Sequence, residues 1–406
     1  MAFFKFIARD RLGNLKEDTV EAVSKEDLVN SLQESGFYII SIGQAAGAKH
    51  YSGRKISHYR GLRSSDLIIF ARELAVLLGA GVTIIKSLDV LTNQVRSIKL
   101  LNALSTIKKD VEGGYTFQNA LKKHRNIFSD FWIHLVETGE ASGHLPASLN
   151  RLAEYLESAE ALKKKIISAL VYPIILVTVS MAALTIFFLK VVPVFDEIFA
   201  SFKVDLPVLT RIVIMVSEII KRYFLLIAAI VTIAAIAISR LVKTEKGGYY
   251  FDQTLLKIPV VGTLVEGVAV ERFTSGLSML IKSGVPILHA LEISENIIGN
   301  KVMEKELRLI KAAVRDGKGM SEVMGKAAIF PPLVVQMIGV GEEIGELGQM
   351  LERISVFYKE RIQTFVDRLA TMFEPIVLVF MGFVIGILLI SMFLPIINLS
   401  SIIKAS

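Results

Sequence analysis

The residues best suited to chemistry are two carboxylates in a motif that occurs twice. The motif reads Gly-Glu-x-x-Gly-x-Leu. Its copies are Gly139, Glu140, Gly143 and Leu145, and then Gly341, Glu342, Gly345 and Leu347. Glycines at this spacing are typical of a tight turn between helices, where the glutamate can cap a helix or accept an interhelical hydrogen bond. A polar contact at an interface, or a divalent-cation ligand, is the alternative.

Copy one of the motif has a second carboxylate nearby. Glu137 lies three residues before Glu140, on the same helix face, so both could contribute to a metal site. Copy two has Gly339 at the position of Glu137, which would confine such a site to copy one. Calcium takes about six or more oxygen ligands. We therefore expect no metal, with Glu137 and Glu140 as the candidate ligands if one binds.

Other catalytic and cofactor-binding patterns are absent from the sequence. There is no Cys, which excludes disulfides, thiol nucleophiles and Cys-zinc sites. No phosphate-binding Gly-Lys-Ser/Thr loop and no Gly-x-Ser-x-Gly occurs, and no two of the six histidines are spaced to ligate one metal from one helix. The long apolar stretches lack the ionisable residue that a pump or transporter needs. We expect neither an enzyme nor a cofactor.

The motif belongs to a duplication of about two hundred residues, far longer than a solenoid repeat of about 20 to 50. The first helix of the block returns 203 positions later, and the Gly-Glu motif returns 202 positions later, so one residue was lost in between. The other matched positions are Phe70 and Phe273, Leu74 and Leu277, Gly81 and Gly284, and Pro173 and Pro375. A domain was therefore copied together with the apolar stretch that follows it.

Three uncharged stretches predict membrane spans. Residues 166–189 hold no charge, and 24 residues at 1.5 Å each reach about 36 Å, enough for a bilayer core of roughly 30 Å. Residues 223–239 form a shorter stretch, and a third begins at Pro375. Within it, Gly382 and Gly386 form a Gly-x-x-x-Gly pattern that could pack against a helix or a partner.

The excess of basic residues is interpreted as a topology signal. The chain has a net charge of +7, and the lysines at 163, 164 and 165 come just before the first span, which places its start in the cytoplasm. No base-reading motif accompanies the charge, so nucleic acid is not expected as a partner.

These observations predict an all-α membrane protein with two homologous cytoplasmic six-helix bundles, three transmembrane helices and a small α+β N-terminal module. Helices are expected over about 65–78, 83–95, 98–112, 116–123, 129–140 and 146–165, and again in repeat 2. The expected segments are a module (1–43), a linker (44–62), repeat 1 (63–165), span 1 (166–189), a periplasmic segment with an amphipathic helix (190–222), span 2 (223–241), a connector (242–266), repeat 2 (267–372), span 3 (373–398) and a tail (399–406).

Two local predictions concern the flanking segments. In the module, alternating residues predict strands around 4–8, 19–23 and 37–42, with a helix over 25–35. In the periplasmic segment, Thr210 is expected to cap the amphipathic helix, which either lies on the membrane interface or extends span 2.

The motifs together resemble the type II secretion system F / type IV pilus assembly PilC family of inner-membrane platform proteins. The resemblance covers essentially the whole chain. Gly139-Glu140-x-Ser142-Gly143-x-Leu145 is similar to the family's Gly-Glu-x-Ser-Gly-x-Leu signature. The start of the chain, Phe4-Lys-Phe-Ile-Ala8, and the Leu206-Pro207 stretch resemble the family's N-terminal module and outer loop. Copy two departs from the signature, because Ile344 stands where Ser is usual.

The resemblance implies a non-enzymatic platform in the bacterial inner membrane, with a cytoplasmic N-terminus and a periplasmic C-terminus. The implied partners are a hexameric secretion or pilus ATPase, pilin or pseudopilin, other inner-membrane assembly proteins, membrane lipid and further copies of the chain, as a homodimer or higher oligomer. Residues 1–165 are expected to carry the main ATPase-facing surface. Pilus and secretion machines both stay open, and a membrane-anchored signalling or assembly scaffold is the alternative.

Overall fold

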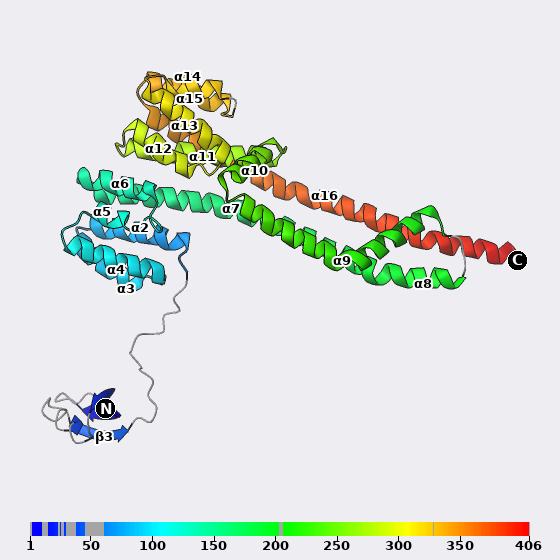
Figure 1. Ribbon diagram of the computed structural model, residues 1–406, viewed down its shortest axis with the longest axis horizontal. Coiled ribbons are helices and arrows are strands. Elements are labelled where there is room, and N and C mark those ends of the chain that lie inside the picture. The colour runs from blue at the N-terminus through cyan, green and yellow to red at the C-terminus, as the bar shows by residue number, and fades with distance from the viewer. Residues whose placement is uncertain are drawn as a thin grey trace. The chain divides into compact units, whose positions relative to one another are not determined.

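The computed structural model describes residues 2–9, 15–22, 25, 28–29, 38–44, 61–202, 206–327 and 329–405. The chain divides into two compact units, Met1–Arg60 and Gly61–Ser406 (Figure 1).

The N-terminal unit contains a three-stranded antiparallel sheet in the order β2-β1-β3. Its strands are β1 (Ala2–Arg9), β2 (Leu15–Ala22) and β3 (Tyr38–Gln44). All three predicted strands are present, and β2 begins four residues earlier than expected because it pairs with the full length of β1. Of the helix predicted over 25–35, the described residues Lys25, Leu28 and Val29 are helical, and the rest lies outside the described residues.

The second unit is helical, and each repeat contains the six predicted helices. Repeat 1 comprises α2 (Ser64–Gly79), α3 (Ile84–Gln94), α4 (Ile98–Glu112), α5 (Phe117–Lys122), α6 (Asp130–Ala141) and α7 (Leu145–Ile186). Repeat 2 comprises α11 (Val261–Lys282), α12 (Ile287–Ile297), α13 (Lys301–Arg315), α14 (Met320–Lys326), α15 (Pro332–Glu343) and α16 (Leu347–Ala405). The connecting elements are η1 (Phe187–Val191), α8 (Val192–Phe202), α9 (Val208–Leu241) and α10 (Glu245–Lys257).

One hydrophobic core runs through both repeats, because α7, α11 and α16 pack against one another. In repeat 1 the ring of Phe70 lies 6.0 Å from Phe128 and 5.9 Å from Trp132, between centroids. In repeat 2 Phe273 packs in the same way on Phe330 at 6.1 Å. The signature residues Phe70, Leu74, Phe273 and Leu277 are therefore buried core residues. Because these core residues recur in the second copy, the same helical bundle forms again.

The last helix of each repeat continues without a break into an apolar stretch. At 1.5 Å per residue, the 42 residues of α7 extend about 63 Å and the 59 residues of α16 about 88 Å. The boundaries expected at 165/166, 372/373 and 398/399 are therefore not helix boundaries. A change from charged to apolar side chains alters the surroundings of a helix, but it does not end the helical backbone.

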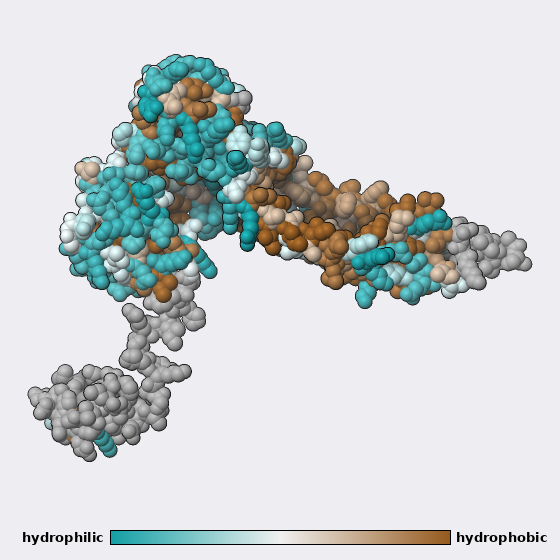
Figure 2. All heavy atoms as spheres, viewed as in Figure 1, coloured by the Kyte–Doolittle hydropathy of each residue, from teal (hydrophilic) through white to brown (hydrophobic). Residues whose placement is uncertain are grey.

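Three helical segments are long and apolar enough to cross a membrane: Leu145–Ser201, Val208–Leu241 and Leu347–Pro395. Figure 2 shows hydrophobic residues gathered where α9 and α16 run, whereas the bundles are hydrophilic outside. The pair α10 and α11, bent by 116°, would count as a fourth candidate if it formed one span. Burial of α11 in the core of repeat 2 accounts for its apolar residues.

The predicted cap at Thr210 is wrong. Helix α9 begins at Val208, directly after Pro207, and the Thr210 hydroxyl donates to the carbonyl oxygen of Ser391 in α16. The expected amphipathic helix and span 2 form this one helix, so the amphipathic segment extends the next apolar stretch. Ser217 of α9 likewise donates to the Phe188 carbonyl at 2.5 Å, which joins α9 to the end of the first span.

Candidate functional site

Glu140 of the first Gly-Glu motif caps a helix that begins 23 residues earlier. One carboxylate oxygen accepts from the backbone N–H of Phe117 at 2.9 Å and the other from that of Gln118 at 3.0 Å. These two N–H groups open α5 and have no partner inside the helix. A carboxylate there forms charge-assisted hydrogen bonds and faces the positive end of the helix dipole. Glu140 thus fixes α5 to the end of α6.

Glu342 repeats this arrangement in copy two. Its carboxylate accepts from the backbone N–H groups of Met320 at 2.5 Å and Ser321 at 2.9 Å, at the start of α14. The Ser321 hydroxyl donates a third hydrogen bond at 2.5 Å. The second copy therefore caps in the same geometry although Ile344 replaces the signature serine.

The glycine before each glutamate allows two helices to touch. A Cβ on Gly139 would lie 2.7 Å from Cβ of Ser148 and 3.1 Å from Cα of Leu145, both in the first turn of α7. A Cβ on Gly341 would lie 3.0 Å from Cα of Leu347, where α16 begins. Ordinary carbon contacts are longer than these distances, so a side chain at either position would push the two helices apart.

The second glycine of each motif forms the turn. Gly143 has φ of +72° and Gly345 has φ of +75°, a backbone conformation that side chains with a Cβ disfavour. Each turn ends one helix and begins a long one, α7 or α16. The other signature pair, Gly81 and Gly284, adopts the same conformation after the first helix of each repeat.

The motif therefore anchors the base of each long helix to its bundle. The first glycine presses the start of the long helix against α6 or α15, the second turns the chain, and the glutamate attaches the short helix beside them. The geometry corresponds to the cap interpretation of the sequence. Both oxygens of Glu140 and Glu342 already accept backbone hydrogen bonds.

The metal alternative gains no support from this geometry. Glu137 contacts Nδ1 of His134 at 2.9 Å and lies 3.9 Å from Nζ of Lys122, and it does not join Glu140 in a common site. Within the described ranges, no group of three or more His, Asp or Glu side chains could hold a metal ion.

A histidine pair between the repeats was not predicted from the sequence. Nε2 of His289 on α12 lies 3.1 Å from Nδ1 of His134 on α6, and the rings meet edge to face. The two histidines are 155 residues apart, so spacing within one helix could not reveal them. Each histidine is followed three residues later by a glutamate, Glu137 or Glu292, with which it pairs. This shared spacing was the one sequence feature that hinted at the histidine pair.

Polar contacts also join the two long helices. Nζ of Lys359 on α16 donates to the Ser158 hydroxyl on α7 at 2.9 Å. Where the first apolar stretch begins, Lys165 pairs with Asp367 at 2.8 Å. The Lys–Asp pair is exposed, so its energetic contribution is small. Its position shows that α7 and α16 run side by side up to this level.

Glu271 of α11 is a buried carboxylate beside this junction. It is 5% exposed and makes no hydrogen bond or ion pair within the described residues. Burial raises the pKa of Glu271 from an ordinary 4.5 to about 7, although the positive charges of Lys359 and Arg272 act to lower it. Burial also raises the pKa of the neighbouring Tyr155 hydroxyl, with Glu271 contributing.

Glu271→Gln is expected to stabilise the detergent-solubilised, delipidated protein at pH 8 and to have little effect at pH 4.5. Because the folded protein holds the proton more tightly, the stability from Glu271 is full below about pH 4.5 and is lost as the pH rises through about 7. The ionised group costs on the order of 3 kcal/mol. Thermal unfolding at both pH values tests this. An equal change in the thermal unfolding midpoint at both pH values would mean that Glu271 is not charged when buried.

The residues proposed for span packing have different surroundings. Pro173 is buried within α7, whereas Pro375 is exposed in α16, and neither breaks its helix. A Cβ added at Gly382 or Gly386 would meet no atom within 4 Å. Their surface is therefore open in the described chain, and packing there stays a prediction.

Comparison with protein-family models matches three parts of the chain. The model described as type II secretion system (T2SS), protein F, matches residues 70–193 and again residues 273–395. The model of the N-terminal domain of the same protein matches residues 1–43. The two larger matches coincide with the two repeats and the apolar stretches that follow them.

Relatives match over nearly the full length. The chain is 34% identical over 403 residues to type IV pilus assembly protein PilC of Myxococcus xanthus, covering 99% of this chain and 96% of that protein. It is 34% identical to the Thermus thermophilus protein of the same name, covering 97% of each. It is 30% identical to type II secretion system protein F of Aeromonas hydrophila, covering 95% of this chain and 99% of that protein.

Proposed function

Because the chain belongs to the type II secretion system protein F family, we propose that it is the membrane platform that couples a cytoplasmic hexameric ATPase to filament assembly. The family consists of structural platform proteins and not enzymes, and its pilus and secretion members match this chain comparably. The cargo in this proposal is pilin or pseudopilin, which the platform moves from the membrane into the filament.

The observation that carries the proposal is the continuity of α7 and α16. A helix held at its base by the Gly-Glu motif and unbroken into an apolar stretch moves as a rigid body. A displacement of the bundle is then passed along the helix to the apolar end. Contacts between α7, α11 and α16 make the two repeats move together.

The proposed topology places both repeats in the cytoplasm. Basic residues precede the first apolar stretch at Lys163 to Lys165 and follow the second at Arg240 and Lys243, as the positive-inside rule expects. Residues 166–189, 223–241 and 373–398 then span the inner membrane, and residues 190–222 and 399–406 lie in the periplasm. Residues 223–241 are all exposed in the described chain, so lipid or another copy in a homo-oligomer covers them.

Gene deletion in the cell that encodes the chain tests this function. We expect loss of surface filaments or of extracellular protein secretion, restored by the full-length gene on a plasmid. Electron microscopy of the cell surface and protein assays of the culture medium measure both. Which activity is lost distinguishes a pilus machine from a secretion machine. Normal filaments together with normal secretion in the deletion strain would contradict the proposal.

A further inference from the structure

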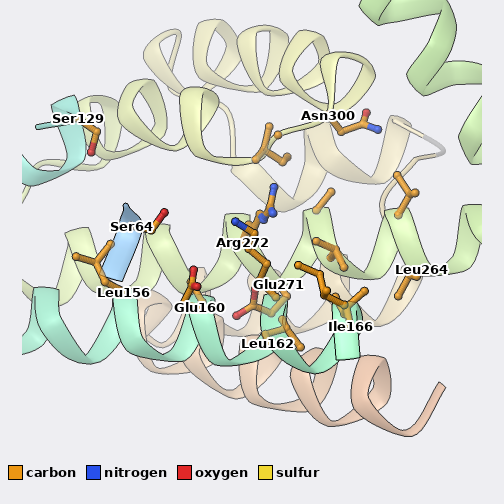
Figure 3. Close-up of a pocket in the computed structure, with 18 of the residues that line it drawn as sticks. Ser64, Ser129, Leu156, Glu160, Leu162, Ile166, Leu264, Glu271, Arg272 and Asn300 are labelled. Atoms are coloured by element: carbon orange, nitrogen blue, oxygen red, sulfur yellow. The ribbon is translucent and has the colours of Figure 1, made fainter. Parts of the chain in front are cut away.

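A cavity of about 760 Å³ lies between the two repeats (Figure 3). It is bounded by α2, α6 with the residues just before it, α7, α10, α11 and the turn before α13. We call it the inter-repeat cavity. Figure 3 shows Leu156 at one end, Ile166 and Leu264 at the other, and Glu160 and Glu271 between the ribbons of α7 and α11.

One end of the inter-repeat cavity reaches the start of the first apolar stretch. Ile166 and Ile167 line it, and they are the first residues of the uncharged stretch that follows Lys163 to Lys165. Most of the remaining wall is aliphatic, from residues such as Leu156 and Val268. In the proposed topology this end lies at the depth of the lipid headgroups, where such a wall suits an amphiphile from the adjoining leaflet.

Three polar groups in the wall lack partners. Within the described residues, Glu271 and Arg272 make no hydrogen bond or ion pair, and Nδ2 of the buried Asn300 has no acceptor. Asp252 shows the contrast, because its carboxylate accepts from the N–H of Lys301 at 2.6 Å. Glu271 is buried and Arg272 is half-buried. Unpaired charges in such positions are costly, so a ligand that satisfies an acid and a base together would bind favourably here.

The fold itself does not require these charges. The residues of repeat 1 that correspond to Glu271 and Arg272 are Ile68 and Ile69, the two residues directly before Phe70, which matches Phe273. The corresponding helix of repeat 1 thus has a half-buried isoleucine, Ile68, at the position where repeat 2 buries a carboxylate, and both residues line the cavity. The buried carboxylate of Glu271 is costly, and repeat 1 folds without one. This indicates that Glu271 has a role other than packing.

We propose that the inter-repeat cavity binds the headgroup of an aminophospholipid, phosphatidylethanolamine, from the leaflet beside the repeats. Glu271, with Glu160 nearby, accepts hydrogen bonds from the primary ammonium group. The phosphate faces Arg272 and Lys163, which line the same cavity. The aliphatic wall leading to Ile166 and Ile167 contacts the start of the acyl chains.

Charge complementarity selects this headgroup. A purely anionic lipid would place its charge beside Glu160 and Glu271 without supplying a cation. Phosphatidylcholine has the same phosphate, but its quaternary nitrogen has no N–H to donate to a carboxylate. The site thus distinguishes two zwitterionic lipids by the hydrogen bonds of the ammonium group.

Native mass spectrometry of the full-length protein tests the proposal. The protein is released from micelles that contain equal amounts of phosphatidylethanolamine, phosphatidylcholine and phosphatidylglycerol with identical acyl chains. We expect phosphatidylethanolamine to be retained about tenfold over phosphatidylcholine, a difference of about 1.4 kcal/mol. Glu271→Gln should bring that ratio close to one.

Matched variants control for folding. Glu343→Gln removes an exposed carboxylate elsewhere in repeat 2 and should keep the preference. Glu271→Ile introduces the residue of repeat 1 and should lose the preference while the thermal unfolding midpoint is kept or raised. Equal retention of all three lipids by the unaltered protein, or an unchanged ratio in Glu271→Gln, would overturn the proposal. The test depends on the membrane spans and not on ATPase coupling, so the two proposals can fail separately.

Discussion

Arg368→Pro is expected to reduce filament assembly or secretion at least tenfold while the protein still accumulates in the membrane. Arg368 lies in α16 near the end of repeat 2, beyond Tyr358, the last α16 residue buried in the core of the repeats, and before the third apolar stretch. It is exposed and makes no side-chain hydrogen bond or ion pair within the described residues. Proline there removes one backbone hydrogen bond and clashes with the carbonyl of Thr364, a cost of about 3 kcal/mol that kinks the helix. A kink interrupts the rigid connection from bundle to membrane.

Arg368→Ala is the matched control, because it removes the same side chain and keeps the helix. Filament counts or secreted protein are compared at equal membrane levels of the two variants. Near-normal assembly by the proline variant would show that α16 need not act as a rigid connection. A loss of assembly that is equal in the alanine variant would instead indicate that the Arg368 side chain is a contact.

Glu140→Ala is expected to cost about 2–4 kcal/mol of stability in repeat 1, and Glu342→Ala a similar amount in repeat 2. Each change leaves two N–H groups at the start of α5 or α14 without their acceptors. Glutamine keeps one acceptor oxygen in place and should cost roughly half as much. Thermal unfolding measures the loss, and faster amide exchange at Phe117 and Gln118 locates it.

Glu343→Ala is the control for the capping prediction, since Glu343 follows Glu342 directly but is exposed. A cost for Glu140→Ala no greater than that for Glu343→Ala would mean that the cap contributes nothing to stability. Preserved exchange protection at Phe117 would lead to the same conclusion.

Much of this fold follows from sequence patterns because they are local. Glycines and apolar periodicity predict the six helices of repeat 1. The duplication predicts the same six helices in repeat 2. The family resemblance drawn from the same motifs is confirmed. The structure also narrows the position at which repeat 2 lost one residue. Leu121 and Met324 occupy matching core positions at an offset of 203, and Phe128 and Phe330 do so at an offset of 202. The loss therefore lies between these two matched pairs.

What could not be predicted depends on contacts between distant parts of the chain. Thr210 is a plausible cap by type and position, but its hydroxyl donates to Ser391, 181 residues away. His134 meets His289 because the two bundles pack together. Glu271 is unremarkable in sequence, and its isolation is evident only once α7 and α16 enclose it. The continuity of α7 was visible in principle, since nothing near Lys165 stops a helix.

Binding of the full-length protein to the hexameric ATPase of its own machine is the most direct test of the central claim. The protein is placed in lipid nanodiscs, and binding and ATP turnover are measured together. The predicted result is micromolar or tighter binding that changes turnover. Arg368→Pro should leave it unaltered, because the kink lies beyond Tyr358, the last α16 residue buried in the core of the repeats. A folded protein that neither binds the ATPase nor changes its turnover would contradict the coupling role and favour a membrane-anchored scaffold.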